Sequence, residues 1–348
     1  MQDLAAQPAD IQTVAGELLG QAVSSVEEIA GGRNSRVYRV VRADGTPVIV
    51  KHYFRHARER RDRFSAEWSG LTFLWEHGIR AIPQPLRADG VQACAMYGAI
   101  EGSRIPAGAA REQDIDQAVG FLAELKALSG SEASRSLGPA SEACFSLSEI
   151  LATIDKRMDR LARVRTAHAE LAAFLSGRFE PAYAALSTWT EAQLAAAGIA
   201  PHAELPQAAR MLSPSDFGFH NAVRRPDGSL VFVDFEHFGW DDPAKTIVDA
   251  ILHPAMELSE PLARRLTRGV LHSWRSDPQL PRRVEAVYPL FGLKWCTILL
   301  NEFVADDQRR RAFAGGDVNQ DAQQAQLAKA ERMLGRILTT YERFSCDG

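Results

Sequence analysis

The sequence has few cysteines and no motif that pairs them. Its four cysteines lie far apart and include no Cys-x-x-Cys pair. This excludes a zinc ribbon and a dense disulfide framework, so we expect a protein of the reducing cytoplasm. Among the nine histidines, we expect His237 and His253 to be structural. A Gly-x-Ser-x-Gly elbow, which would indicate acyl transfer by a serine triad, is also missing.

The chain also lacks a charge excess, a long apolar run and internal repeats. It has 40 basic and 44 acidic residues, a net charge of −4, so it should not attract nucleic acid or an anionic membrane. The most apolar stretch, Val287 to Leu300, contains Pro289 and Lys294 and is too short to span a bilayer. No basic region followed by an apolar core marks a secretion signal. We therefore expect neither nucleic acid nor a membrane as a partner.

Two apolar runs flank a turn at Pro226-Asp227-Gly228 and predict a β-hairpin, because glycine supplies the positive φ of the turn. Asn221 and Asp234 are about equally far from that turn, so they should face each other, within a residue of register, at ~5 Å. Asp216 lies just upstream of Asn221. Three oxygen-bearing side chains at the mouth of a hairpin suit Mg²⁺. The alternative is a surface hairpin in which these residues only form turns.

Lys51 and Glu67 are predicted to form an ion pair. Lys51 ends the apolar run Val48-Ile49-Val50, and Glu67 lies on the inner stripe of the following helix. Each is a charge on a largely apolar surface, which is costly unless the two residues pair. The pair would hold the lysine ammonium toward a polyphosphate. The alternative is a lysine that reaches solvent at the sheet edge and a solvated glutamate.

Two further segments are candidates for binding a nucleotide. Gly32 lies in a glycine-containing loop, where backbone N–H groups can approach phosphate oxygens, and Asn34 and Ser35 add donors. Tyr97 and Ala99 lie where a strand leaves the first part of the chain, and the backbone there can pair with an adenine edge. Neither segment is a specific motif, so an ordinary hairpin loop and an ordinary linker remain the alternatives.

The order of the predicted elements indicates an α+β fold with two lobes. Residues 1–100 would form a small nucleotide-binding lobe of antiparallel strands with one helix, and residues 101–348 a mainly helical lobe that carries the hairpin. The small lobe is predicted to contain strands at 37–41, 48–54, 85–89 and 93–99 and a helix at 60–77. The large lobe is predicted to contain helices at 112–129, 147–175, 178–198, 243–252, 258–275, 282–303 and 319–343.

Over residues 24–255 the chain resembles the aminoglycoside phosphotransferase and choline kinase family, small-molecule members of the bilobal protein-kinase-like fold. Asp216 matches the catalytic Asp of that family. Asn221 and Asp234, the latter within Asp-Phe-Glu, match its metal-binding Asn and Asp. Lys51 and Glu67 match its phosphate-binding Lys and the helix Glu that accompanies it.

Other positions extend or limit this resemblance. Asp242-Pro243 and Asp249 match the element that follows in the family, and Asp242 should cap a helix. Pro214 replaces a family His that braces the catalytic loop, which leaves open a nucleotide-binding protein without activity. The long activation segment and Ala-Pro-Glu motif of protein kinases are missing, which implies a small-molecule acceptor.

The resemblance implies a kinase that uses ATP and Mg²⁺ to phosphorylate a hydroxyl of a small, sugar-like molecule. Lys51 and Glu67 would serve the phosphates of ATP, and Asn221 and Asp234 would bind the metal. Asp216 would accept or orient the acceptor hydroxyl. The choice of ATP over GTP is taken from the family. Two alternatives are a catalytically silent nucleotide-binding regulator and an enzyme of the same fold that transfers AMP.

Overall fold

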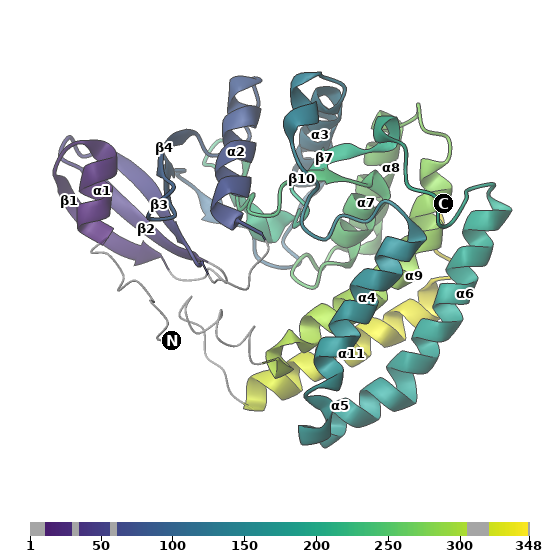
Figure 1. The fold of residues 1–348 in the computed structure, drawn as a ribbon. Helices are drawn as coiled ribbons and strands as arrows, with labels where there is room; N and C mark the ends of the chain where they lie inside the picture. Colours follow the sequence, from purple (N-terminus) through teal and green to yellow (C-terminus); the bar gives the residue numbers. More distant parts are fainter. Residues whose placement is uncertain (1–10, 30–34, 56–60, 305–319, 347–348) are drawn as a thin grey trace.

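The computed structural model describes residues 11–29, 35–55, 61–304 and 320–346, and it has a β-sheet part and a mostly helical part (Figure 1). The strands are β1 Val23–Ile29, β2 Ser35–Arg42, β3 Pro47–Tyr53, β4 Pro85–Asp89, β5 Cys94–Gly98, β6 Ser103–Arg104, β7 Met211–Ser213, β8 Ala222–Arg224, β9 Leu230–Phe232 and β10 Gly239–Asp241. The helices are α1 Ile11–Leu19, α2 Arg63–Glu76, α3 Glu112–Ser129, α4 Leu147–Ala162, α5 Ala169–Phe174, α6 Glu180–Ala196, α7 Pro243–Leu252, α8 Glu260–Ser273, α9 Leu280–Leu299 and α11 Gln320–Thr340.

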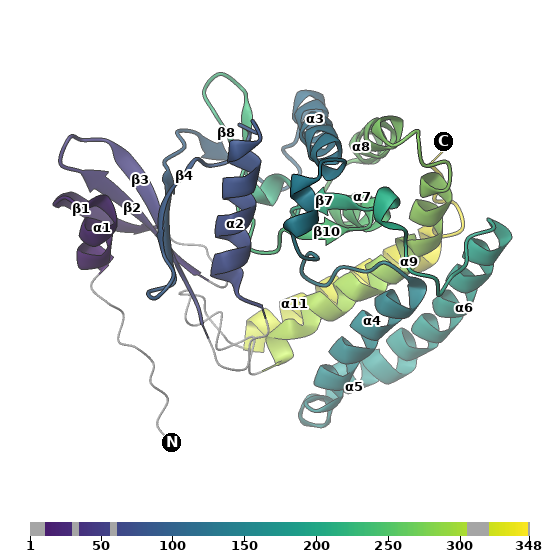
Figure 2. The same cartoon turned by 45° about the horizontal axis from the view of Figure 1, so that its top comes forward.

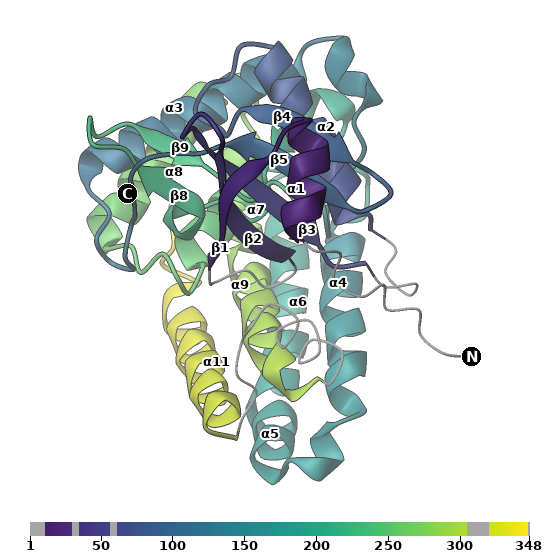
Figure 3. The same ribbon diagram turned by 90° about the vertical axis from the view of Figure 1, so that its left-hand side faces the viewer.

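Five antiparallel strands form the main sheet, in the order β1-β2-β3-β5-β4. Helix α1 lies across one face of it (Figure 3), where Val14 and Leu18 join a core that includes Val50. Helix α2 packs on the other face and contributes Leu71 to the larger core. Because side chains alternate along a strand, Lys51 points to the face opposite Val50, toward α2.

The helical part is built around α9, which is buried along most of its length. Helices α4, α6, α7 and α11 pack against it. Figure 2 shows α9 and α11 side by side, with α4 and α6 on the flank. Among the described residues, no helix is long and apolar enough to cross a membrane.

The predicted hairpin is formed by β8 and β9. Its turn is closed by a bond from the Arg225 N–H to the Ser229 carbonyl at 2.8 Å, and Gly228 has the expected positive φ of 85°. The strands pair Ala222 with Phe232, and the Val233 N–H bonds to the Asn221 carbonyl at 2.8 Å. Asp234 is therefore one residue beyond the position opposite Asn221, so the prediction of register within a residue is confirmed.

The prediction of one helix over residues 147–175 is wrong. Helix α4 ends at Ala162, and the short α5 continues through a π-helical turn at Leu175–Phe179 into α6. The chain reverses between α4 and α6 so that the two helices can pack together. The Tyr183 hydroxyl of α6 donates to the Asp155 carboxylate of α4 at 2.8 Å. Tertiary packing thus overrides a local pattern that contains no glycine or proline to mark the break.

Candidate active site

A cavity of about 860 Å³ lies between the main sheet and the helical part. Lys51 on β3 and Glu67 on α2 line it from the sheet side. Asp216 and Asn221, before β8, and Asp234, after β9, line it from the side of the hairpin. A cavity of this size suits small-molecule ligands. The fold therefore brings five predicted site residues to one chamber.

The ammonium of Lys51 is paired with two carboxylates. Its Nζ lies 2.6 Å from Glu67 Oε2 and 2.5 Å from Asp234 Oδ1, so the predicted pair with Glu67 is present. Burial acts to lower the pKa of Lys51, but the charges of Asp234 and Glu67 outweigh it, and the pKa lies well above its ordinary value. Lys51 is therefore a fixed cation on the cavity wall.

Asp216 is held by three side chains. Its Oδ1 lies 3.1 Å from His220 Nε2 and 3.4 Å from His253 Nε2. The Asn221 amide nitrogen donates to the Asp216 carbonyl at 3.0 Å and to Oδ2 at 3.3 Å. Burial acts to raise the pKa of Asp216, but hydrogen bonds from the two histidines outweigh it, and the pKa lies well below its ordinary value. The carboxylate therefore stays ionised at neutral pH.

The two histidines beside Asp216 stack on each other. The rings of His220 and His253 are 3.8 Å apart with an interplanar angle of 8°. Both rings direct Nε2 at the same Asp216 oxygen, so the arrangement fits hydrogen bonding to that carboxylate. Trp295 packs edge-on against His253 at 4.4 Å, which fixes the outer ring of the stack.

The sequence matches a family model over most of the chain. The model is described as "Phosphotransferase enzyme family" and matches residues 25–287. The chain belongs to this family. The predicted small-molecule kinase related to aminoglycoside phosphotransferases and choline kinases is thereby confirmed. No curated protein has a significantly matching sequence.

Solved structures of other kinases share the fold of this phosphotransferase. A spectinomycin phosphotransferase in complex with ADP and spectinomycin aligns with a TM-score of 0.66 at 11% identity, over 97% of this chain and 100% of that one. The choline kinase LicA from Streptococcus pneumoniae aligns at 0.60 and 14% identity, over 94% and 100%. A choline kinase from Cryptosporidium parvum aligns at 0.60 and 9%, over 91% and 90%. The predicted bilobal kinase-like fold is confirmed.

The remaining predicted site residues lie at or near the same cavity. Ser35, at the start of β2, and Tyr97, near the end of β5, are buried and line it. Ala99 is half-buried, and its neighbours Gly98 and Ile100 line the cavity. The predicted phosphate-loop residues Gly32 and Asn34 lie outside the described residues, so their placement stays a prediction.

Sequence reasoning missed the histidines that contact Asp216. The sequence predicts structural roles for His237 and His253, yet His237 and His253 both line the cavity. His220 directly precedes Asn221, and a polar residue at that place in a catalytic loop was a signal that could have been used. The approach of His253 depends on where α7 ends, which no spacing in the sequence reveals.

Proposed function

We propose that this phosphotransferase uses ATP and Mg²⁺ to move the γ-phosphate to a hydroxyl of a small, sugar-like molecule. The observation that carries the proposal is one cavity lined by both a fixed cation, Lys51, and an ionised carboxylate, Asp216. ADP in the spectinomycin phosphotransferase structure supports ATP as the donor. Residues 1–100 would form the nucleotide-binding lobe, and residues 101–348 the lobe that carries the acceptor site.

Asn221 and Asp234 would hold Mg²⁺. The amide nitrogen of Asn221 bonds to Asp216, while its amide oxygen makes no hydrogen bond within the described part of the chain. The Asp234 side chain is 38% exposed, and Lys51 contacts only one of its carboxylate oxygens. Hard oxygen donors of this kind are those that Mg²⁺ prefers. Bound there, the ion would neutralise charge on the phosphate oxygens.

The other residues would position the two substrates. Lys51 would hold phosphate oxygens of ATP, and Glu67 would orient Lys51. Asp216 would take the proton of the acceptor hydroxyl as the hydroxyl oxygen bonds to the γ-phosphorus. The bond from that phosphorus to the bridging oxygen breaks, and ADP leaves. His220 and His253 would keep the Asp216 carboxylate ionised and directed at the acceptor.

The nucleotide would lie against the sheet. Ser35 would contribute a hydroxyl to the phosphates, together with the preceding loop that contains Gly32 and Asn34. The backbone beside Tyr97 and Ala99 would border the adenine ring. These assignments rest on the family resemblance and on the position of β2 and β5 at the cavity.

The wall on the far side of Asp216 fits a hydroxyl-rich acceptor. It presents Trp295, Asn301 and Gln326, and the buried Oε1 of Gln326 has no hydrogen-bond partner among the described residues. A carboxamide oxygen can accept a bond from a hydroxyl. Glu257, Glu302 and Lys329 bring charges of both signs to the cavity lining.

Asp216→Asn tests the catalytic role. Asparagine keeps the shape and cannot take a proton, so phosphate transfer should fall by about 10²–10⁴-fold, while ATP binding, measured by calorimetry, is retained. Asp227→Asn is the matched control, because Asp227 lies exposed in the turn of the same hairpin, bonded to Ser229. Near-normal turnover in Asp216→Asn would remove Asp216 from this role.

An ATP-consumption screen against sugars, amino alcohols and aminoglycosides tests the acceptor class, with products identified by mass spectrometry. A product heavier by one phosphate supports the proposal, and a product heavier by AMP identifies a nucleotidyl transferase. Binding of ATP and Mg²⁺ without transfer to any acceptor would identify a nucleotide-binding regulator, the alternative that Pro214 raises.

A further inference from the structure

Helix α7 carries a line of charged side chains although it is buried on every side. All residues from Pro243 to Leu252 are buried. Asp241, just before the helix, is followed at intervals of four residues by Lys245, Asp249 and His253. Residues four apart lie on one face of a helix. We call these four residues the α7 ladder.

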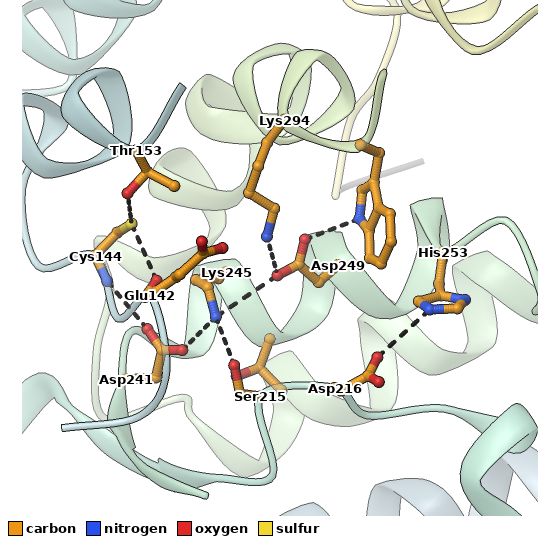
Figure 4. A network of polar contacts seen from close by, with 12 residues as sticks. Glu142, Cys144, Thr153, Ser215, Asp216, Asp241, Lys245, Asp249, His253 and Lys294 are labelled. Carbon is orange, nitrogen blue, oxygen red and sulfur yellow. Dashed lines mark hydrogen bonds and ion pairs between the residues drawn. The ribbon is translucent and has the colours of Figure 1, made fainter. Parts of the chain in front are cut away.

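Each charge of the α7 ladder is paired inside the protein (Figure 4). The Lys245 ammonium donates to Asp241 and lies 3.6 Å from Asp249 Oδ2. Asp249 also accepts from Lys294 Nζ at 2.7 Å and from Trp295 Nε1 at 2.9 Å. Replacing buried ion pairs with apolar residues is often neutral or stabilising. Stability alone therefore does not explain why this helix carries the ladder.

The α7 ladder meets the catalytic loop at two points. Lys245 Nζ donates to Ser215 Oγ at 3.2 Å, and His253 Nε2 lies 3.4 Å from Asp216 Oδ1. Ser215 has a φ of +67°, a left-handed conformation that is unfavourable for serine and persists only when surrounding contacts impose it. Pro214, one residue earlier, contributes only its carbonyl, which accepts from the Asp216 N–H at 2.9 Å.

Other bonds complete the hold on Ser215. Its hydroxyl donates to the Ser141 carbonyl at 3.1 Å, and its N–H donates to Ser213 Oγ at 3.0 Å. Ser213 Oγ is in turn 2.9 Å from the hydroxyl of Thr246, the residue after Lys245. Helix α7 therefore contacts the catalytic loop on both sides of Pro214.

We infer that Lys245, through the α7 ladder, is a positioning residue that sets the place of Asp216. The inference rests on the proposed kinase function. Lys245 is buried and is not among the residues that line the cavity. It holds the strained Ser215, and the backbone at Ser215 directs the next residue, Asp216, into the cavity. A displacement of about 1 Å in such a group can reduce turnover about 10²-fold.

Two variants test the inference: one changes Lys245 and its ion-pair partner, and the other changes Ser215. The double variant Asp241→Asn with Lys245→Met replaces both partners of one buried ion pair. The side-chain Oδ1 at position 241 is kept as the acceptor for the Cys144 and Asp242 N–H groups. Ser215→Ala removes the hydroxyl and leaves the ladder charges paired. Asp242→Asn with Arg283→Met is the matched control. It removes another buried ion pair of α7, at 3.1 Å, that does not contact the catalytic loop.

Both test variants should lower kcat about tenfold to 100-fold and change KM for ATP less than about threefold. Combining them should lower kcat no further than the stronger one alone, because both break the same connection. The control should lower the melting temperature and leave kcat unchanged. Equal kcat losses in control and test variants, or unchanged kcat in Ser215→Ala, would overturn the inference. If the double variant fails to fold, Ser215→Ala decides.

A crystal structure of the test variants separates this inference from the proposed function. Asp216 should move away from His253, and this readout needs no turnover. If the wild-type protein transfers no phosphate, the proposed function fails, and the position of Asp216 alone decides the inference. An unmoved Asp216 carboxylate would overturn it.

Discussion

Asp234 combines a strained backbone with a charged contact. Its φ is +69°, which costs a residue other than glycine about 1–3 kcal/mol. The next N–H, of Phe235, donates to Glu67 Oε1 at 3.2 Å, and the Asp234 carboxylate contacts Lys51. Glu67 thus holds both the lysine and the turn that presents Asp234. The proposed metal ligand is fixed before any ligand arrives.

Asp234→Asn should weaken metal binding and leave the stability of the fold nearly unchanged. Asparagine tolerates a left-handed backbone and keeps the side-chain shape, so the melting temperature should change by only a few degrees. Loss of the carboxylate should weaken Mg²⁺-dependent ATP binding by about tenfold or more. Titration calorimetry with Mg²⁺ and with EDTA measures this. Asp44→Asn, in the turn between β2 and β3, is the control. An unchanged response to EDTA would remove Asp234 as a metal ligand.

At the residue scale, spacing predicted contacts made within one hairpin or by two adjacent elements. Asn221 and Asp234 follow from the turn at Gly228, and Lys51 and Glu67 follow from alternation and helical spacing. The contacts of Asp216 with His253 could not be predicted, because they depend on the angle at which α7 meets the loop. Such an angle is set by packing and leaves no trace in local spacing.

Two helices border the proposed acceptor end, and their contact depends on a glycine. A Cβ on Gly292 of α9 would lie 2.3 Å from Ile337 Cγ1 of α11. Ile337 is fully buried and has little room to give way. Gly292 thus allows the two helices to approach closely. Gly335 of α11 has open space around its Cβ position.

Gly292→Ala and Gly335→Ala should have opposite effects on stability. The first should lower the free energy of unfolding by about 1–3 kcal/mol through overpacking. The second should raise it by up to about 1 kcal/mol, since alanine is the better helix former. Urea denaturation at neutral pH measures both. Equal changes in the two variants would contradict the close approach of α9 and α11.

At the element scale, long amphipathic helices and the hairpin were predictable, whereas short strands that no turn connects were not. Strands β7 and β10 have three residues each and pair across a long stretch of sequence. Three residues are too few to show a period of two. The break after Ala162 was missed for a related reason: the reversal is imposed by packing of α6 on α4, without a glycine or proline signal.

The sheet part and the helical part are joined by backbone-directed bonds as well as by Lys51 and Asp234. Arg61, before α2, donates to the carbonyls of Glu236 at 3.1 Å, Phe238 at 2.8 Å and Pro139 at 3.2 Å. Three acceptors from two segments of the helical part share this one guanidinium. Arg61 therefore fixes the segment after Asp234 against α2.

Arg61→Met should weaken the whole molecule. Losing three bonds from a charged donor should lower the free energy of unfolding by about 2–4 kcal/mol. Chemical denaturation followed by tryptophan fluorescence measures it. Arg264→Met is the control, because within the described residues the ion pair of Arg264 is an exposed one with Glu260, worth at most about 1 kcal/mol. A loss in Arg61→Met no larger than in the control would show that this contact does not join the two parts.

The last helix, α11, contributes Gln326 and Lys329 to the cavity but none of the proposed phosphate-handling groups. In the proposed function, part of the acceptor wall and the groups that transfer phosphate would thus be encoded in separate stretches of the gene. Under that proposal, substitutions in α11 would change the preferred acceptor and leave the phosphate-transfer groups unchanged.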